Sequence, residues 1–210
     1  MTNTLHRYGD AASFHDDYVV FAMCCRGKND KDSVPKLRKF LEMALPFKPV
    51  NLGDARHGGA LRPSRTMNPT SHWNRDILPD FEAVIAGLDT PTTAAAVFDN
   101  RPAAEDFVKA VVEADLGLSV NISTSIDGAE QCCHHAGIPR HSVGYSLGFE
   151  GKTEHLPNED VLKVATMCGH GMIAASLAKK MIDWVKEGRR TPEQAASYLT
   201  RFCSCGVFNP

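Results

Sequence analysis

The fold is decided by residues 93–123, which read TAAAVFDNRPAAEDFVKAVVEADLGLSVNIS. The apolar run from Thr93 to Asp99 predicts a buried strand, and Leu116 to Ser123 predicts a second strand. Between them, Asn100 can cap a helix that has Pro102 in its first turn and an apolar inner face. Such a strand–helix–strand unit typically makes its two strands parallel.

The same alternation continues on both sides of this stretch. Downstream, a helix that carries Cys132 to His135 should end at Gly137, and His141 to Gly148 alternates apolar and polar residues as a strand does. Upstream, Tyr18 to Cys25 and Val50 to Gly53 read as strands on either side of a helix. We therefore predict an α/β domain with a mostly parallel or mixed sheet and flanking helices. The alternative is a ferredoxin-like α+β fold, in which the first four strands form a split arrangement.

The C-terminal part of the chain is expected to be helical. Helices are predicted roughly from Met172 to Lys186 and from Pro192 to Phe202, and Thr191 with Gln194 forms a capping box for the second. Two helices joined by a short loop are typical of an antiparallel hairpin. Within one compact domain, we expect a flexible arm (1–17), an α/β sheet region (18–156) and a C-terminal helical region (157–210).

The composition is that of an ordinary globular protein. The 210 residues are 43% hydrophobic and 23% charged, and the formal net charge is -2. Without a basic excess, nucleic acid is not an expected partner. No apolar run is long enough to cross a membrane, and the N-terminal residues lack the pattern of a signal peptide, so we expect a cytoplasmic protein. The oligomeric state is not determined by these features.

Seven cysteines are many for a cytoplasmic chain of this length. The number is odd and no signal peptide is expected, so a secreted disulfide framework fits poorly. The alternatives are buried packing, metal ligation and redox chemistry.

The C-terminal hairpin would bring three of these cysteines together. Cys168 and His170 lie just before the first helix, and Cys203 and Cys205 follow the second. A helix N-terminus lowers the pKa of a thiol, which makes Cys168 a candidate nucleophile with His170 as its base. We predict Cys168, Cys203 and Cys205 as metal ligands, with Cys133 or His170 as a possible fourth.

Two kinds of cofactor suit this set of ligands. A [4Fe–4S] cluster held by three thiolates keeps one iron open to a substrate, and an open zinc site provides a similar Lewis acid. The competing interpretation is a glycine-rich turn with buried, unligated cysteines.

The irregular stretch from Asp54 to Pro79 is the expected contact region for a substrate. It carries Arg56, His57, Arg62 and Arg65, and arginine binds carboxylates and phosphates through two parallel hydrogen bonds. We therefore predict an anionic small molecule as the substrate. A solvated basic loop without a ligand is the alternative.

Three hypotheses for the function follow. The first is a cytoplasmic iron–sulfur or other metal-binding enzyme whose open metal site serves a non-redox lyase or hydrolase step. The second is a metal-free thiol enzyme in which Cys168 is the nucleophile or redox thiol. The third is a binding or carrier module, without catalysis, that has a structural metal site.

Overall fold

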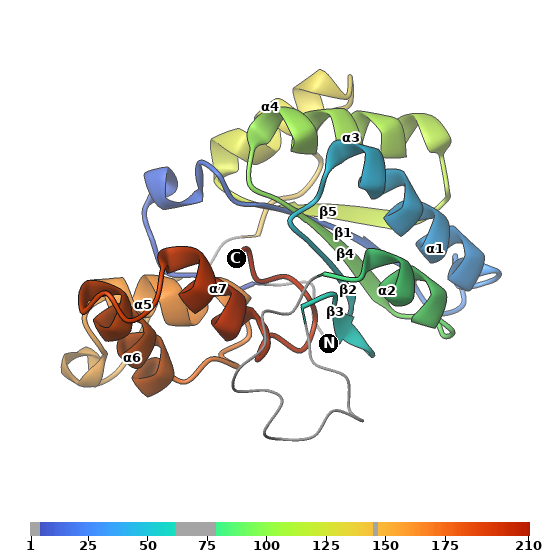
Figure 1. Ribbon diagram of the computed structural model, residues 1–210. Helices are drawn as coiled ribbons and strands as arrows, with labels where there is room; N and C mark the ends of the chain where they lie inside the picture. The colour runs from blue at the N-terminus through green and yellow to red at the C-terminus, as the bar shows by residue number, and fades with distance from the viewer. Residues whose placement is uncertain (1–4, 62–78, 145–146) are drawn as a thin grey trace.

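The computed structural model describes residues 5–61, 79–144 and 147–210. Its centre is a five-stranded sheet with helices on both faces (Figure 1). The strands are β1 (Tyr18–Met23), β2 (Asn51–Asp54), β3 (Gly58–Gly59), β4 (Thr93–Phe98) and β5 (Ser119–Ser123). The α-helices are α1 (Ser33–Ala44), α2 (Phe81–Gly87), α3 (Arg101–Ala114), α4 (Ile126–His135), α5 (Glu159–Ala165), α6 (Ala175–Lys186) and α7 (Pro192–Thr200).

The strand order is β3-β2-β4-β1-β5, and every neighbouring pair is antiparallel. The prediction of a mostly parallel or mixed sheet is therefore wrong. The unit β4–α3–β5 does exist, but β1 lies between its two strands and runs antiparallel to both. The order of β2, β4, β1 and β5 is that of the split arrangement given above as the ferredoxin-like alternative.

The expected strand from His141 to Gly148 is also wrong. Its described residues form neither a helix nor a strand, and they lie on the surface, with the Leu147 side chain 88% exposed. The alternating pattern is present in the sequence, but residues 141–144 and 147–148 are exposed and are not paired with a strand. Periodicity predicts a strand only where one face packs on a core.

Both faces of β1 are buried, and its side chains alternate between two apolar cores. Tyr18, Val20 and Ala22 pack against the layer that contains α1, α2, α3 and α4. Val19 and Phe21 pack against the C-terminal region, from α5 to Phe208. Figure 1 shows these helices on opposite sides of the sheet. A strand covered on both faces has the continuous apolar sequence that Tyr18–Met23 shows.

Side-chain caps set the starts of most α-helices in the described ranges. Asn100, Ser125 and Asn158 accept backbone N–H groups at the starts of α3, α4 and α5. The capping box of Thr191 with Gln194 is present at α7. None of the helices in the described ranges has the length and apolar character needed to cross a membrane.

Residues 5–17, where a flexible arm was expected, contact the C-terminal region. The His6 N–H donates to the Gly169 carbonyl oxygen (2.9 Å), and Leu5 packs directly on Gly169. The Arg7 guanidinium forms a buried ion pair with Asp17 and donates to the Val207 carbonyl oxygen at 3.0 Å.

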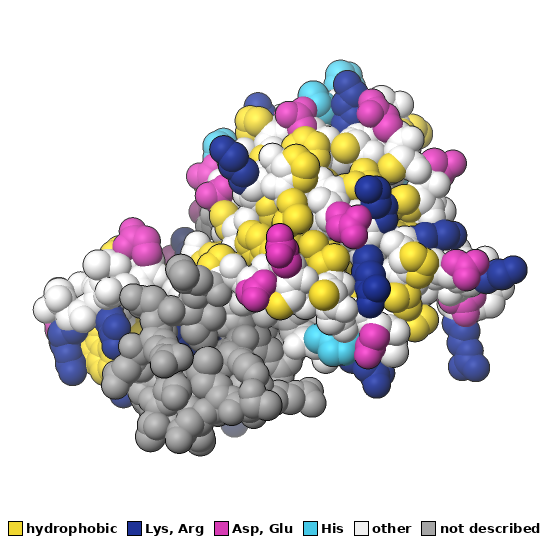
Figure 2. Space-filling model, turned by 45° about the vertical axis from the view of Figure 1, so that its right-hand side comes forward, with side chains coloured by type: hydrophobic (Ala, Val, Ile, Leu, Met, Phe, Trp, Pro, Cys, Tyr) yellow, Lys and Arg dark blue, Asp and Glu magenta, His cyan; other side chains and the backbone are white. Residues whose placement is uncertain are grey.

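The surface drawn in Figure 2 mixes charges of both signs. Lysine and arginine side chains lie among aspartate and glutamate side chains over the described part of this face, with apolar atoms between them. Such a distribution agrees with the net charge of -2. This face therefore presents no extended field of one sign.

Candidate functional site

A buried group of cysteines lies between the sheet and the C-terminal helices. Cys168, Cys203 and Cys205 are 0%, 1% and 4% exposed and belong to the apolar core that covers Val19 and Phe21 of β1. Cys168 ends a short 3-10 turn after α5, whereas Cys203 and Cys205 follow α7. Segments more than thirty residues apart in the sequence thus meet at one place.

Cys205 is the centre of this group. Its Sγ atom lies 3.9 Å from Sγ of Cys203 and 3.3 Å from Nδ1 of His170. His170 is half-buried, and it lies between Gly169 and Gly171, which both have positive φ angles (69° and 68°). These two glycines allow the sharp path that turns the imidazole back toward the cysteines.

The Cys203 thiol is the group that favours the ionised form. The Cys205 S–H donates to it, and this hydrogen bond lowers the pKa of Cys203 to about 6 against the opposing effect of burial. Backbone N–H groups of Cys205, Val207 and Phe208 donate to the same sulfur and lower its pKa further. The pKa of Cys205 is raised, because its proton is held in the bond to Cys203 and because it is buried. A hydrogen-bonded thiolate is a metal ligand or a nucleophile.

Cys168 is placed differently from the sequence prediction. Helix α6 begins at Ala175 rather than Met172, because Gly171 has a positive φ angle and Ala174 is extended (φ -64°, ψ 134°). Cys168 therefore does not lie at the N-terminal end of that helix. Its Sγ instead accepts the backbone N–H of Met172 at 3.2 Å.

The loop after Cys205 is held against the sheet by contact between glycine backbones. A Cβ atom at Gly206 would lie 2.6 Å from Cα of Gly59 and 2.7 Å from Cα of Gly53. Beside them, the fully buried Asn51 donates from Nδ2 to the Phe208 carbonyl oxygen at 3.0 Å. Its Oδ1 atom is buried and has no hydrogen-bond partner in the structure.

Asn51, Gly53 and Gly59 were not predicted as site residues. The one feature of the sequence that points to Gly59 is the pair Gly58-Gly59 in a stretch rich in arginine. This stretch predicts a substrate loop and gives no indication of a contact with the cysteines. A glycine whose Cβ position is filled by another backbone cannot be recognised without the fold.

Of the predicted substrate residues, Arg56 and His57 lie on the β2–β3 turn. Asp54 pairs with Ala94 of β4, so its side chain faces the α1–α3 side of the sheet, opposite to the side where Gly53 meets Gly206. His57 Nδ1 lies 3.0 Å from Oδ2 of the buried Asp54, and the Arg56 N–H donates to the same carboxylate. Arg62 and Arg65 lie outside the described residues.

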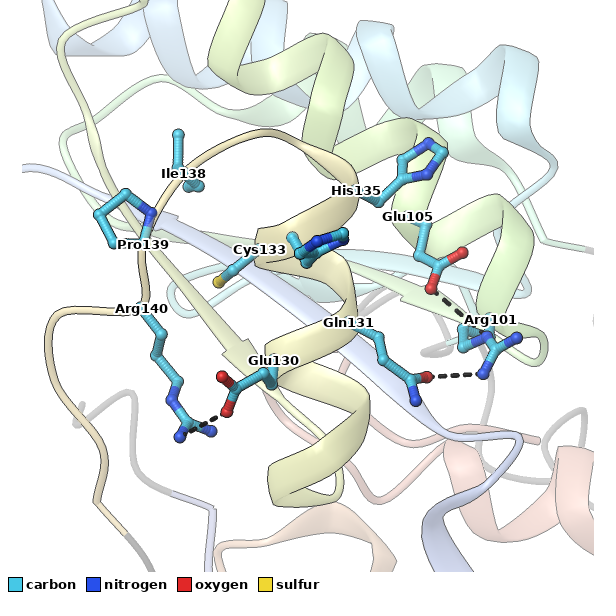
Figure 3. Close-up of a pocket in the computed structure, with 10 residues that line it drawn as sticks. Arg101, Glu105, Glu130, Gln131, Cys133, His135, Ile138, Pro139 and Arg140 are labelled. Carbon is cyan, nitrogen blue, oxygen red and sulfur yellow. Dashed lines mark hydrogen bonds and ion pairs between the residues drawn. The ribbon is translucent and has the colours of Figure 1, made fainter.

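Cys133, a possible fourth ligand, is not brought to the cysteine group. It lies on α4, on the other side of the sheet, and lines an open cavity of about 580 Å³ between α3 and α4 (Figure 3). The two arginines of this cavity already have partners: Arg140 pairs with Glu130 (2.8 Å), and Arg101 pairs with Glu105 (3.4 Å). The cavity walls therefore carry balanced charge.

As the side chains stand, no three or more His, Cys, Asp and Glu residues in the described ranges are arranged to hold a metal ion. In the comparisons with known proteins, no family model, no curated protein and no solved structure matches this chain. The candidate site is therefore defined by its own geometry: three buried cysteines and one half-buried histidine beneath the sheet.

Proposed function

We propose that this chain is a cytoplasmic enzyme whose centre is the group of Cys168, His170, Cys203 and Cys205. The group would bind a thiophilic metal, either zinc or an iron–sulfur cluster. The metal would serve as a Lewis acid in a non-redox lyase or hydrolase step on an anionic small molecule. This function rests on residues of this chain alone.

The observation that carries the proposal is the position of the Cys205 sulfur. It lies within 4 Å of a second thiol and of an imidazole nitrogen, in a core where all three thiols are at most 4% exposed. Apolar packing alone does not explain an imidazole beside a hydrogen-bonded pair of thiols. Burial of such a pair costs free energy unless its polar atoms have hydrogen-bond partners. Thiolate sulfur and imidazole nitrogen are the ligands that zinc and iron prefer.

The protein contributes position and protection from water. Backbone N–H groups of residues 205, 207 and 208 orient the Cys203 sulfur, as hydrogen bonds to metal-bound thiolates do elsewhere. Val207 and Phe208, which are 1% and 3% exposed, belong to the same apolar core as the three cysteines. His170 is more exposed than the cysteines, so it marks the side from which a small molecule would enter.

Two finer elements belong to this proposal. An antiparallel hairpin of α6 and α7 would present Cys203 and Cys205 next to the segment of Cys168. Arg56, on the turn between β2 and β3, would be the residue that attracts the anionic substrate, because a guanidinium binds carboxylates and phosphates through two parallel hydrogen bonds.

The first test is the metal content of protein purified without oxygen. Iron with acid-labile sulfide, or zinc, is expected in stoichiometric amount, and Cys205→Ser should lose it. Cys133→Ser is the matched control, because that thiol lies on the opposite side of the sheet and should leave the metal content unchanged. Metal-free wild-type protein, or equal metal in the two variants, would contradict a metal site.

The second test concerns the substrate class. Inorganic phosphate or citrate should raise the melting temperature of the metal-loaded protein, and Arg56→Ala should reduce this shift. Lys186→Ala removes an exposed cation from the end of α6 and serves as the control. A shift of equal size in both variants would exclude Arg56 from anion binding.

A metal-free thiol enzyme is the second candidate, and the lowered pKa of Cys203 favours it. In this case Cys203, rather than Cys168, is the thiolate, and the neighbouring Cys205 is the resolving thiol. Protein without bound metal should then react stoichiometrically with a small disulfide near neutral pH, and Cys203→Ser should remove that reaction. If Cys168→Ser removes it instead, the assignment to Cys203 fails.

A further inference from the structure

The two edges of the sheet differ in how they are protected. At one edge, β3 has only two residues, and its Gly59 packs on the backbone of Gly206. At the other edge, β5 is five residues long, and it pairs along its whole length with β1 but with no other strand in the described ranges (Figure 1). The outer N–H and C=O groups of β5 therefore have no partner strand in that part of the chain.

The sequence of β5 lacks the devices that keep an edge strand from pairing. Ser-Val-Asn-Ile-Ser contains no charged residue and no proline, and its register with β1 is unbroken, so the strand has no bulge. Edge strands of natural proteins are blocked by such features, because an open edge otherwise pairs with another chain. The composition of β5 is therefore that of a strand with a partner on each side.

The surface beside this edge is apolar. Val120 is 38% exposed, although it lies opposite Ala22 on the face of the sheet that α1 and α3 cover. It borders a groove of about 230 Å³, whose lining also includes Phe40, Val111, Leu116 and Leu118. A strand added to β5 would cover Val120 with its own side chains, and burial of this apolar surface would favour association.

The order of residues in β5 indicates which strand fits. The strand reads nearly the same in both directions from Asn121, with a β-branched residue on each side and then a serine. Two copies of β5 related by a two-fold axis at Asn121 would pair antiparallel, with Val120 of each copy opposite Ile122 of the other. Directly opposed side chains stabilise a sheet, and the two-fold axis provides this apolar pair twice.

Charges at the two ends of β5 suit the same arrangement. Nζ of Lys36 lies 3.7 Å from the position of a Cβ atom at Gly117, just before the strand, and Asp127 lies in the first turn of α4, just after it. Antiparallel pairing brings the start of one strand to the end of the other, so Lys36 of each copy would approach Asp127 of the other. Asp115 also lies before the strand, so these charges favour the register more than they add affinity.

We infer that the chain forms a homodimer in which β5 of two copies pairs antiparallel about Asn121 and joins the two sheets into one. A two-fold contact of this kind uses the same surface on both copies and closes on itself, so the assembly ends at two chains. The inference goes beyond the proposed function. Val120 lies on the side of the α1–α3 core, whereas the cysteine group belongs to the core on the other face, so dimerisation and metal content are tested separately.

The experiment is sedimentation equilibrium of the full chain over a range of concentrations. Wild-type protein should have twice the mass of one 22.9 kDa chain. Asn121→Lys and Asn121→Glu should each weaken the dimer by at least about tenfold, because like charges then face each other at the axis. An equal mixture of the two variants should restore the dimer, since opposite charges face each other in the heterodimer. Met172→Lys is the control, because this exposed residue contacts the cysteine group on the other face of the sheet.

Two kinds of outcome would overturn the inference. Wild-type protein that stays monomeric at every concentration, or that exceeds the mass of two chains, contradicts a closed dimer. A dimer that both Asn121 variants leave unchanged, or folded variants that stay monomeric when mixed, contradicts pairing about Asn121. If a variant does not fold, amide hydrogen exchange of the wild-type protein provides the test: exchange in residues 119–123 should slow as concentration rises, and exchange that is independent of concentration contradicts the inference.

Discussion

At Cys203, burial and hydrogen bonding act on the thiol in opposite directions, and hydrogen bonding prevails. A side chain that is 1% exposed should hold its proton, yet one S–H and three backbone N–H groups directed at the sulfur lower its pKa to about 6. Cys132 shows the opposite balance: burial, with the nearby Glu105 and Cys133, raises its pKa to about 12. Both cysteines are buried, so their pKa values differ because of the hydrogen-bond donors that reach the sulfur of Cys203.

The ultraviolet absorbance of thiolate tests Cys203 directly. In reduced, metal-free protein, one thiolate should form with a midpoint near pH 6, because the hydrogen bonds stabilise the anion. Cys203→Ser should remove this step, and Cys132→Ser should leave it in place. A first thiolate that forms only near the ordinary cysteine pKa of 9.0 would show that the hydrogen bonds do not act as described.

Cys132 makes an alkaline contribution to stability. Its pKa is raised in the folded state, so its stabilising effect is complete below the unfolded pKa of 9 and is lost as the pH rises through about 12. The free energy of unfolding of wild-type protein should therefore fall more steeply over this range than that of Cys132→Ala. Urea unfolding at several pH values gives the slope of the free energy of unfolding against pH for each protein. Parallel curves would show that Cys132 ionises equally in both states.

The sequence predicts that Cys168, Cys203 and Cys205 lie in one region, but it does not predict the hydrogen bonds of each. Cys168 was favoured as the thiolate because a helix was expected to begin at Met172, and the actual start at Ala175 removes that reason. The donors of Cys203 come from its own tail, where residues 205 to 208 fold back. Such a turn depends on the close packing of Gly206 with Gly53 and Gly59, which no local pattern shows.

Among the elements, those set by local interactions were predicted and those set by distant partners were not. The caps Asn100 and Thr191 act within three residues, so the starts of α3 and α7 follow from the sequence. The position of β1 between β4 and β5 depends on pairing across the whole chain. The local strand–helix–strand patterns therefore predict parallel neighbouring strands, although the neighbouring strands are antiparallel.

The contact of the cysteine loop with the β2–β3 hairpin can be tested by adding one methyl group. Gly206→Ala places a Cβ atom 2.6 Å from backbone at a φ angle of 71°, so we expect a loss of about 2–4 kcal/mol from backbone strain and overpacking together. Gly188→Ala is the matched control, because its φ angle is also 71° but the space around it is open. It should lose only about 1–2 kcal/mol. Equal losses of unfolding free energy in the two variants, measured in urea, would show that the loop accommodates the added methyl group without cost.

At the scale of the whole molecule, the two ends of the described chain stabilise the same site. Residues 5 to 7 contact Gly169 and Val207, which flank the two cysteine segments. Asn209 donates from Nδ2 to the Asp16 carbonyl oxygen at 3.0 Å and to the Asp17 carboxylate at 3.1 Å. The N-terminal segment thus holds the tail that carries the donors of Cys203.

Breaking the ion pair of Arg7 with Asp17 should affect both stability and the site. Arg7→Ala leaves a buried carboxylate without its partner, and the expected loss is about 3–5 kcal/mol. Lys179→Ala breaks the exposed pair with Asp183 and should cost less than about 1 kcal/mol. Loosening of the tail should also raise the pKa of Cys203 in Arg7→Ala. An unchanged Cys203 titration would separate the N-terminal segment from the site.

The position of β1 has a consequence for biosynthesis. β1 lies early in the described chain, and the C-terminal partners that cover Val19 and Phe21, from Val161 to Phe208, are made much later. During translation, this inner strand of the sheet therefore exposes an apolar face and unpaired backbone edges, the features that cause nascent chains to associate. Chaperones that bind short apolar segments would find their target at Tyr18–Met23, and its release would coincide with the arrival of the cysteine tail.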